Sequence, residues 1–239
     1  MTVVVGACEA DVAVIATDTR LSRQTASGRE VVRDDETKLR YSGKGWYAGA
    51  GYARAIDLSL EVLRVAPIAD TDDVRRILVM GRELLLEPLK REHPEHAAMI
   101  DGTSMMLTLR DPSGPVVMMF APVLLGDKLG ILRPGKLYMI PPIDLAPGVV
   151  QDITAEAGTY SIGSPTQEER IAAVATAVAR SAAAVVARSA EVSDRLDIGI
   201  HRISQSSGSA ALLRLHGRSV ELAGCKTFDD LMRFYVRPE

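Results

Sequence analysis

Two runs of apolar residues near the start of the chain constrain its fold more than any other feature. Residues 3–8 and 12–17 are almost wholly apolar, and the short stretch 9–11 separates them. A strand with one face in water alternates apolar and polar side chains, whereas an unbroken apolar strand is typical of a sheet covered on both faces. The sequence therefore predicts a hairpin inside a sheet that is buried on both sides.

The rest of the chain falls into groups of strands and groups of helices rather than a strict alternation. Residues 21–37 are polar and predict an extended loop. The other predicted elements are a hairpin at 38–51, helices at 52–65 and 70–93, a hairpin at 103–121, a helix at 166–189, strands at 196–203 and 209–222, and a helix at 228–235. Grouped elements are typical of α+β proteins. We therefore predict an α+β fold with two sheets between layers of helices.

One stretch does not fit this pattern. Residues 122–158 carry five prolines among short apolar runs, which predicts an insertion of short strands and loop. The chain has 239 residues, 47% of them hydrophobic, and can bury a core without disulfides or metals. We therefore expect a single domain over residues 1–239 with an insertion at 122–158.

Charge and cysteine content argue against several classes of protein. The net charge is −3 and Lys and Arg are scattered, so neither nucleic acid nor an anionic membrane is an expected partner. No apolar run approaches the roughly 18 residues of a membrane span, and the start of the chain lacks the pattern of a signal peptide. Cys8 and Cys225 have no metal-ligand spacing, and His93 and His96 fit a solvated helix end. We expect a cytoplasmic protein without cofactor or metal.

Chemistry is concentrated in the N-terminal part of the chain, beginning with Thr2. Removal of the initiator methionine is normal before a small residue, and it leaves Thr2 with a free α-amine. A threonine hydroxyl is a weak nucleophile, and the amine of the same residue is a base whose pKa lies near neutrality. Thr2 can therefore act as a nucleophile that carries its own base.

Three further features follow Thr2. Asp18 lies in the sequence ATDTR at the end of the second apolar run, Lys38 opens a predicted strand, and the small residues 48–53 pass from a strand into a helix. Each has an ordinary explanation by itself, as a turn carboxylate, a surface lysine and a tightly packed junction. Glycine at a helix N-terminus also exposes backbone N–H groups that can stabilise an oxyanion.

Taken together, these residues resemble the proteasome β-subunits and their bacterial relatives, Anbu and the heat-shock-locus protease. Members of that family begin with a catalytic threonine and continue with an apolar strand, an A-x-D-[ST]-R motif, a strand-opening lysine and a [GA]-x-G-x-A stretch. The counterparts here are Thr2, residues 16–20, Lys38 and residues 49–53, and Asp18 follows Thr2 by 16 residues as in the family. The resemblance implies the four-layer αββα sandwich of the N-terminal nucleophile (Ntn) hydrolases.

The resemblance also implies a role for each residue. Thr2 is the nucleophile, Lys38 keeps its amine neutral and stabilises the alkoxide, and Asp18 holds Lys38 in place. The Gly51 N–H holds the oxyanion, and Ser164, in the sequence Ile-Gly-Ser before the long helix, orients the amine or a water. The specificity pocket of the family falls on residues that are mostly small: Leu21, Ser22, Gly49 and Ala53.

The implied activity is that of a threonine peptidase or amidase that acts on peptides or proteins. The resemblance further implies a homo-oligomeric ring and allows an unidentified regulatory unfoldase as a partner. No propeptide is expected before Thr2, so activation depends on removal of Met1. If Met1 is kept, the amine base does not exist.

One departure from the family leaves alternatives open. After the long helix the family has an Asp, and a Ser three positions later, that support the amine. Alignment on the next strand places Ser189 and Val192 at these positions, and Asp194 fits only with a shift. A catalytically inactive ring subunit and a peptide ligase on the same site are therefore the alternatives to a peptidase.

Overall fold

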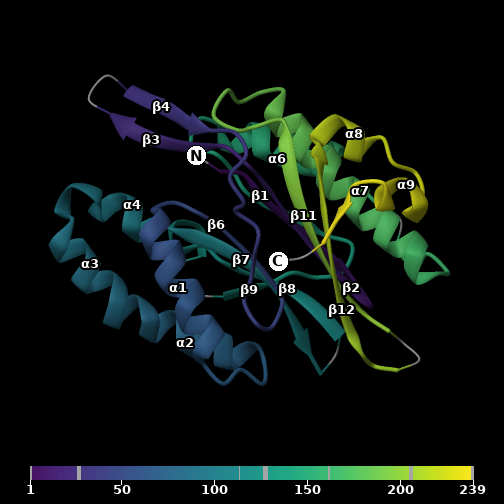
Figure 1. The fold of residues 1–239 in the computed structure, drawn as a ribbon, viewed down its shortest axis with the longest axis horizontal. Helices are drawn as coiled ribbons and strands as arrows, with labels where there is room; N and C mark the ends of the chain where they lie inside the picture. The colour runs from purple at the N-terminus through teal and green to yellow at the C-terminus, as the bar shows by residue number, and fades with distance from the viewer. Residues whose placement is uncertain are drawn as a thin grey trace.

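The computed structural model describes residues 2–25, 28–112, 114–125, 129–160, 162–204 and 207–237. In this part of the chain the strands form two large antiparallel sheets and one two-stranded ribbon, and helices flank the sheets (Figure 1). The protein is thus a mixed structure of helices and antiparallel sheets.

The first sheet has six strands in the order β10-β1-β2-β11-β12-β13, and the second has five in the order β5-β6-β7-β8-β9. The strands of the first sheet are β1 Val4–Glu9, β2 Val12–Asp18, β10 Leu137–Ile140, β11 Arg195–Ile203, β12 Ala210–Arg218 and β13 Tyr235–Val236. Those of the second are β5 Arg40–Tyr41, β6 Trp46–Ala50, β7 Ser104–Asp111, β8 Gly114–Phe120 and β9 Leu129–Ile131. The ribbon consists of β3 Leu21–Thr25 and β4 Gly28–Arg33.

The predicted N-terminal hairpin lies in the interior of the first sheet. β1 and β2 pair antiparallel from Val4↔Thr17 to Glu9↔Val12, and every residue of both strands is buried. One face of the hairpin packs against helix α7 (Gln167–Val186), and the other packs against the second sheet. The prediction of a hairpin in a sheet covered on both faces is confirmed.

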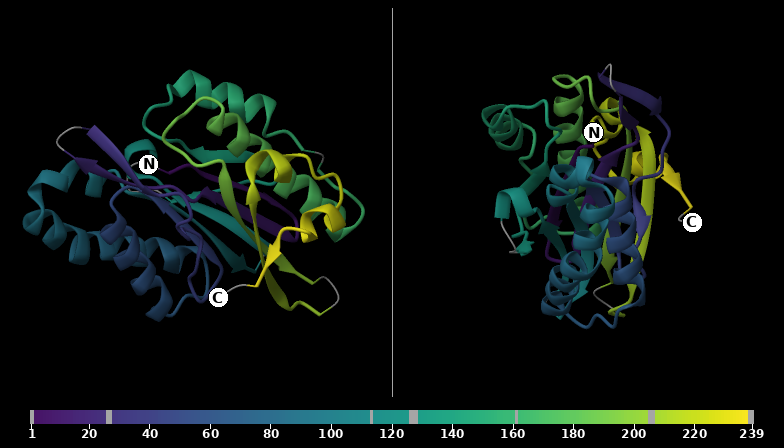
Figure 2. Two further views of the ribbon diagram at one scale, coloured as in Figure 1. Left: turned by 45° about the horizontal axis from the view of Figure 1, so that its top comes forward. Right: turned by 90° about the vertical axis from the view of Figure 1, so that its left-hand side faces the viewer.

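Two groups of helices lie on opposite sides of the paired sheets (Figure 2). The group beside the second sheet contains α1 Ala53–Val65, α2 Thr71–Gly81, the π-helical turn η1 Arg82–Leu86, α3 Glu87–Glu92, the 3-10 turn η2 Pro94–His96 and α4 Ala97–Asp101. The group beside the first sheet contains α6 Pro147–Glu156, α7, α8 Ser219–Ala223 and α9 Phe228–Met232, and the short α5 Pro122–Leu125 follows β8. Separate hydrophobic clusters lie between α7 and the first sheet, between the two sheets, and between α1 and the second sheet. None of the described helices combines the length and apolarity needed to cross a bilayer.

The starts of the two longest predicted helices follow from capping side chains. Asp70 accepts a hydrogen bond from the Asp73 N–H at the start of α2, as the acidic run predicts. Thr166 and Glu169 form a reciprocal capping box at the start of α7. The helix predicted over residues 70–93 is interrupted by the π-helical turn between α2 and α3.

Within residues 21–37, predicted as an extended loop, Leu21–Thr25 and Gly28–Arg33 instead form the ribbon β3–β4 beside the start of the chain (Figure 1). Val31 and Val32 of this ribbon are about half exposed, at 49% and 51%. A ribbon that covers no core needs no alternation of apolar and polar residues, so the usual signal of a strand is missing from its sequence.

The proline-rich stretch 122–158 contributes to both sheets. β10 pairs with β1, β9 pairs with β8, and residues 147–156 form helix α6, where only short strands and loop were predicted. Pro147 opens α6, a position where the missing N–H costs no intrahelical hydrogen bond. The proline therefore marks the start of a helix and not an irregular segment.

Candidate active site

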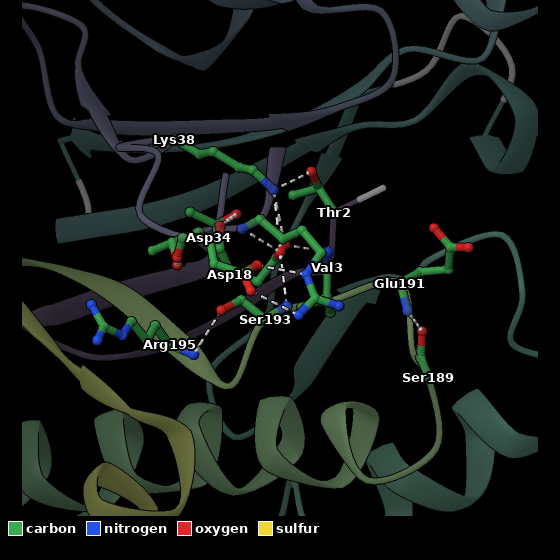
Figure 3. Close-up of polar contacts among 12 residues, drawn as sticks. Thr2, Val3, Asp18, Asp34, Lys38, Ser189, Glu191, Ser193 and Arg195 are labelled. Carbon is green, nitrogen blue, oxygen red and sulfur yellow. Dashed lines mark hydrogen bonds and ion pairs between the residues drawn. The ribbon is translucent and has the colours of Figure 1, made fainter. Parts of the chain in front are cut away.

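The hairpin itself brings Thr2 and Asp18 together. Thr2 lies two residues before β1, Asp18 is the last residue of β2, and Val4 pairs with Thr17. The two residues therefore lie at the same end of the hairpin. Lys38 comes from the segment between β4 and β5 and reaches the same point (Figure 3).

Lys38 contacts both of the other predicted residues. Its Nζ lies 2.8 Å from Thr2 Oγ1 and 3.2 Å from each carboxylate oxygen of Asp18. Only 11% of the Lys38 side chain is exposed, and that of Asp18 is fully buried. Burial lowers the pKa of Lys38 below its ordinary value, and the charge and hydrogen bonds of Asp18 offset this only in part. The ammonium is therefore held directly on the hydroxyl oxygen of Thr2.

Asp18 is held in one orientation by backbone donors as well as by Lys38. The Val3 N–H donates to Oδ1 at 3.1 Å, and the N–H groups of Arg20 and Ser193 donate to Oδ2 at 3.0 and 3.3 Å. A buried carboxylate costs much less when its lone pairs are filled in this way. Because the Val3 N–H is one of the donors, Asp18 also fixes the residue next to Thr2.

Arg20, the last residue of ATDTR, ties the site to two neighbouring segments. Its guanidinium donates from Nε and Nη2 to the two carboxylate oxygens of Asp34, at 2.6 and 3.0 Å. Its Nη1 donates to the Ala190 carbonyl at 2.5 Å. Asp18 and Arg20 therefore have different roles. Asp18 holds Lys38, and Arg20 joins the segment after β4 to the loop after α7.

Gly51 lies at the junction of β6 and α1, as predicted. Its φ of +132° and the approach of Thr103, whose Oγ1 would lie 2.6 Å from an added Cβ, both exclude a larger residue. The next N–H, that of Tyr52, donates to the same Thr103 oxygen at 3.1 Å. Within the part of the chain that the structure describes, no residue accepts a hydrogen bond from the Gly51 N–H. This N–H is thus free to bind an anionic oxygen.

The predicted pocket residues lie on β3, β6 and α1. Leu21 and Ser22 are half-buried at the start of β3, and Ala53 is exposed at the start of α1. Ser22 Oγ is buried and has no partner among the described residues. An added Cβ on Gly49 would lie 2.9 Å from the Ile56 side chain, so this glycine makes room for α1. Gly49 does not by itself widen the predicted specificity pocket.

Ser164 lies at the other end of the first sheet. Its carbonyl accepts a hydrogen bond from Arg170 Nη1 at 2.5 Å, and Arg170 pairs with Asp11 in the turn between β1 and β2. Thr2 lies at the opposite end of β1, whose 6 residues span about 20 Å. The structure therefore corrects the expectation that Ser164 orients the Thr2 amine, because α7 begins at the turn end of the hairpin and not at the Thr2 end.

The structure brings a carboxylate to the loop after α7 that the sequence did not single out. The pairing of β10 with β1 ends at Val4↔Ile140, and residues 141–146 follow it. Among them, Asp144 places its carboxylate oxygens 2.7 and 2.9 Å from Ser189 Oγ. The sequence feature that marks Asp144 is that no other acidic residue occurs in the stretch 128–151.

Ser189 reaches this region from the loop after α7, and its hydroxyl also accepts a hydrogen bond from the Glu191 N–H at 3.1 Å. In the view of Figure 3, Lys38 and Ser189 lie on different sides of Val3. Val192 is buried against the α7 cluster, and Asp194 forms an ion pair with Arg218. Asp194 therefore does not supply the carboxylate that the family pattern expects here, whereas Asp144 contacts this loop through Ser189.

Among the described residues, no group of three or more His, Cys, Asp and Glu side chains is arranged to hold a metal ion. His93 and His96 instead stack around Tyr52, with ring centroids 6.2 and 5.1 Å from the tyrosine ring. Cys8 and Cys225 are buried free thiols.

Comparison with known proteins finds a likeness among solved structures. No protein-family model matches the sequence, and no curated protein does. A solved structure of an Anbu (Gly-1) mutant from Hyphomicrobium sp. strain MC1 has a TM-score of 0.60 to this chain. The match covers 98% of this chain and 95% of the other at 13% sequence identity. At that identity the likeness shows the fold alone, and over nearly its full length this chain is similar in fold to Anbu.

Proposed function

We propose that this protein is an Ntn-type threonine peptidase or amidase, in which Thr2 becomes the N-terminal residue once Met1 is removed. The observation that carries the proposal is the 2.8 Å contact between Lys38 Nζ and Thr2 Oγ1, with Asp18 holding the same ammonium. The site residues would be Thr2, Asp18, Lys38 and Gly51. The substrate is a peptide or protein amide bond.

In the proposed reaction the α-amine of Thr2 takes the hydroxyl proton, directly or through a water, as Oγ1 attacks the carbonyl carbon. The carbonyl π electrons move to oxygen, and the Gly51 N–H donates to that oxyanion. The C–N bond then breaks, and the amine returns its proton to the leaving nitrogen. Water attacks the resulting ester in the same way and restores the Thr2 hydroxyl.

Lys38 supports both the base and the nucleophile. An ordinary α-amine has a pKa of about 7.7–8.0, and a neighbouring positive charge disfavours its protonated form. The ammonium of Lys38 therefore favours the neutral amine that can accept a proton. The same charge, at 2.8 Å from Oγ1, stabilises the alkoxide as it develops.

We further propose that the Asp144–Ser189 pair orients the Thr2 amine. The pairing of β10 with β1 supports this, since it ends at Val4↔Ile140, two residues from Thr2 and four residues before Asp144. This pair would take the place of the Asp and Ser that the family pattern expects after the long helix. The segment 122–158 would then be part of the site and not an appendage to it.

The arrangement of helices and sheets supports the four-layer αββα sandwich for the whole chain as a single domain of residues 1–239. We also propose a homo-oligomeric ring in the cytoplasm. Large apolar side chains exposed on the α1–η1 helices, Val65, Met80 and Leu84, support an interface between subunits. Free buried cysteines support a reducing compartment.

Hydrolysis of fluorogenic peptides by the wild-type protein and by Thr2→Ala tests the proposal. We expect turnover by the wild type and none by Thr2→Ala, with the same unfolding temperature for both. Equal turnover by both variants would contradict the proposal. Absence of turnover by the wild type, with no acyl-enzyme formed, would favour an inactive ring subunit. Amide products formed with an added amine would favour a ligase.

A further inference from the structure

A buried charged network contacts the Lys38 segment at Thr37. At its centre is Asp197 of β11, whose side chain is 1% exposed. Its Oδ1 lies 2.9 and 3.2 Å from Nη2 and Nε of Arg214 and 3.0 Å from Nδ1 of His216. Its Oδ2 is buried without a partner in the part of the chain that is described.

The network faces the space between the two sheets. Leu196 and Ile198 pack toward α7, so Asp197 between them points to the opposite face of the sheet. Asp197 pairs with Thr17, the residue before Asp18. The carboxylate therefore lies at the Thr2 end of the sheet, one position from the residue that holds Lys38.

Arg214 connects this network to the Lys38 segment. Its Nη2 donates to Thr37 Oγ1 at 3.3 Å, and its side chain is only 11% exposed. Both guanidinium donors that contact Asp197 converge on one oxygen, which leaves Nη2 shared between the carboxylate and Thr37. Thr37 directly precedes Lys38, so a contact that fixes Thr37 also fixes the start of the lysine side chain.

We propose that Asp197 and Arg214 are positioning residues, which act through Thr37 to keep the Lys38 ammonium on Thr2 Oγ1. The inference rests on the proposed function of that site. Lysine has a long flexible side chain, and a displacement of about 1 Å at a reacting group lowers rates by about 100-fold. Anchoring the backbone next to Lys38 reduces the freedom that the side chain would otherwise have.

The first test measures the rate at which a threonine-directed epoxyketone modifies Thr2. Thr37→Val removes only the acceptor and leaves the Asp197–Arg214 ion pair intact, and we expect it to slow modification about tenfold without weakening the reversible binding of the probe. Thr37→Ser, which keeps the hydroxyl, should be slowed less. The double variant Thr37→Val/Arg214→Met should be no slower than the slower single variant, since both changes break the same link.

Arg218→Met is the matched control. Arg218 lies on the same strand as Arg214 and also pairs with an aspartate, Asp194, but among the described residues it has no hydrogen bond or ion pair with the Lys38 segment. We expect it to react at the wild-type rate. A Thr37→Val variant at the wild-type rate, or effects of Thr37→Val and Arg214→Met that multiply in the double variant, would overturn the proposal.

The second test does not depend on activity. Lys38 is one of six lysines, and its signal in the spectrum of isotope-labelled lysine can be assigned with Lys38→Arg. Burial holds the pKa of Lys38 below its ordinary value, so an ammonium released toward water should titrate at higher pH. We expect this rise in Thr37→Val and Arg214→Met but not in Arg218→Met. An unchanged Lys38 titration would overturn the proposal, whereas an unreactive wild type with the expected titrations would contradict only the proposed function.

Discussion

At the scale of single residues, Lys38 links the other members of the site. Its ammonium contacts both the hydroxyl of Thr2 and the carboxylate of Asp18. Replacement with Met removes the charge that stabilises the alkoxide, and we expect kcat for peptide hydrolysis to fall about 100-fold or more. Lys44→Met, at an exposed position of the next turn, should leave kcat unchanged. Equal kcat values for the two variants, measured with one fluorogenic peptide, would rule out this role.

His201, which lies outside the candidate site, makes the free energy of unfolding depend on pH. Burial, together with the positive charge of Arg110, lowers the pKa of His201 from 6.5 to about 4. Between pH 4 and pH 6.5 the unfolded chain therefore binds more protons than the folded chain. The free energy of unfolding should fall as the pH drops from 6.5 to 4, by about 3 kcal/mol from this group.

The measurement is denaturant unfolding at several pH values, with His201→Gln as the comparison. Gln does not titrate, so the variant should lose this part of the pH dependence whatever its absolute stability. His201 contacts Thr108 Oγ1 at 3.3 Å, and both residues are buried. An equal fall in stability for both proteins would show that other groups cause the acid sensitivity.

At the scale of elements, the junction of β6 and α1 requires Gly51. Its positive φ and the contact with Thr103 predict that Gly51→Ala lowers the free energy of unfolding by about 2 kcal/mol. The same change disturbs the proposed oxyanion donor, so we expect kcat to fall about 100-fold. Urea unfolding and peptide hydrolysis measure the two effects.

Gly81→Ala is the matched control for this prediction. Gly81 ends α2 with ordinary helical dihedrals, and an added Cβ there meets nothing within 4 Å. Alanine should therefore stabilise the protein by about 1 kcal/mol and leave kcat unchanged. If Gly51→Ala behaved like Gly81→Ala in both measurements, the proposed role of the junction would be wrong.

The elements also show which parts of the structure the sequence can predict. The hairpin β1–β2 was predictable because both of its faces are buried, which leaves unbroken apolar runs. The ribbon β3–β4 was not, since none of its described side chains belongs to a hydrophobic cluster. Helix α6 is not evident from the sequence, because prolines among short apolar runs indicate irregular structure, although proline is common at the first position of a helix.

At the scale of the whole molecule, the contact between the two sheets depends on Gly199. This residue of β11 lies under Trp46 of β6, and an added Cβ would lie 2.4 Å from the indole Cγ. Trp46 Nε1 also donates to the Ile200 carbonyl at 3.1 Å, which limits how far the ring can move. We expect Gly199→Ala to lower the free energy of unfolding by about 1–3 kcal/mol.

Thermal and urea unfolding measure this effect. Gly148→Ala is the comparison, because an added Cβ at Gly148 meets nothing within 4 Å. This variant should raise the free energy of unfolding by less than about 1 kcal/mol, because alanine has a higher helix propensity than glycine. If the two variants had the same stability, the packing of the sheets against each other would not be as tight as the structure indicates.

Local sequence predicts some residues of the candidate site, whereas others depend on contacts between distant parts of the chain. Thr2 and Asp18 were placed together by the sequence alone, because a hairpin joins them. Ser164 was misplaced, since a Gly-Ser pair before a helix does not reveal which end of the sheet that helix approaches. The Asp144–Ser189 contact depends on the pairing of β10 with β1, residues more than one hundred apart in the sequence, and only the structure shows it.

The central claim is that Thr2 is an N-terminal nucleophile with a free amine. Intact mass of the purified protein before and after treatment with a threonine-directed epoxyketone tests it most directly, because the adduct requires both the hydroxyl and the amine. We expect a mass that corresponds to the chain beginning at Thr2, one adduct on the wild type, and none on Thr2→Ala. A chain that retains Met1 and forms no adduct, or an adduct that persists in Thr2→Ala, would contradict the account.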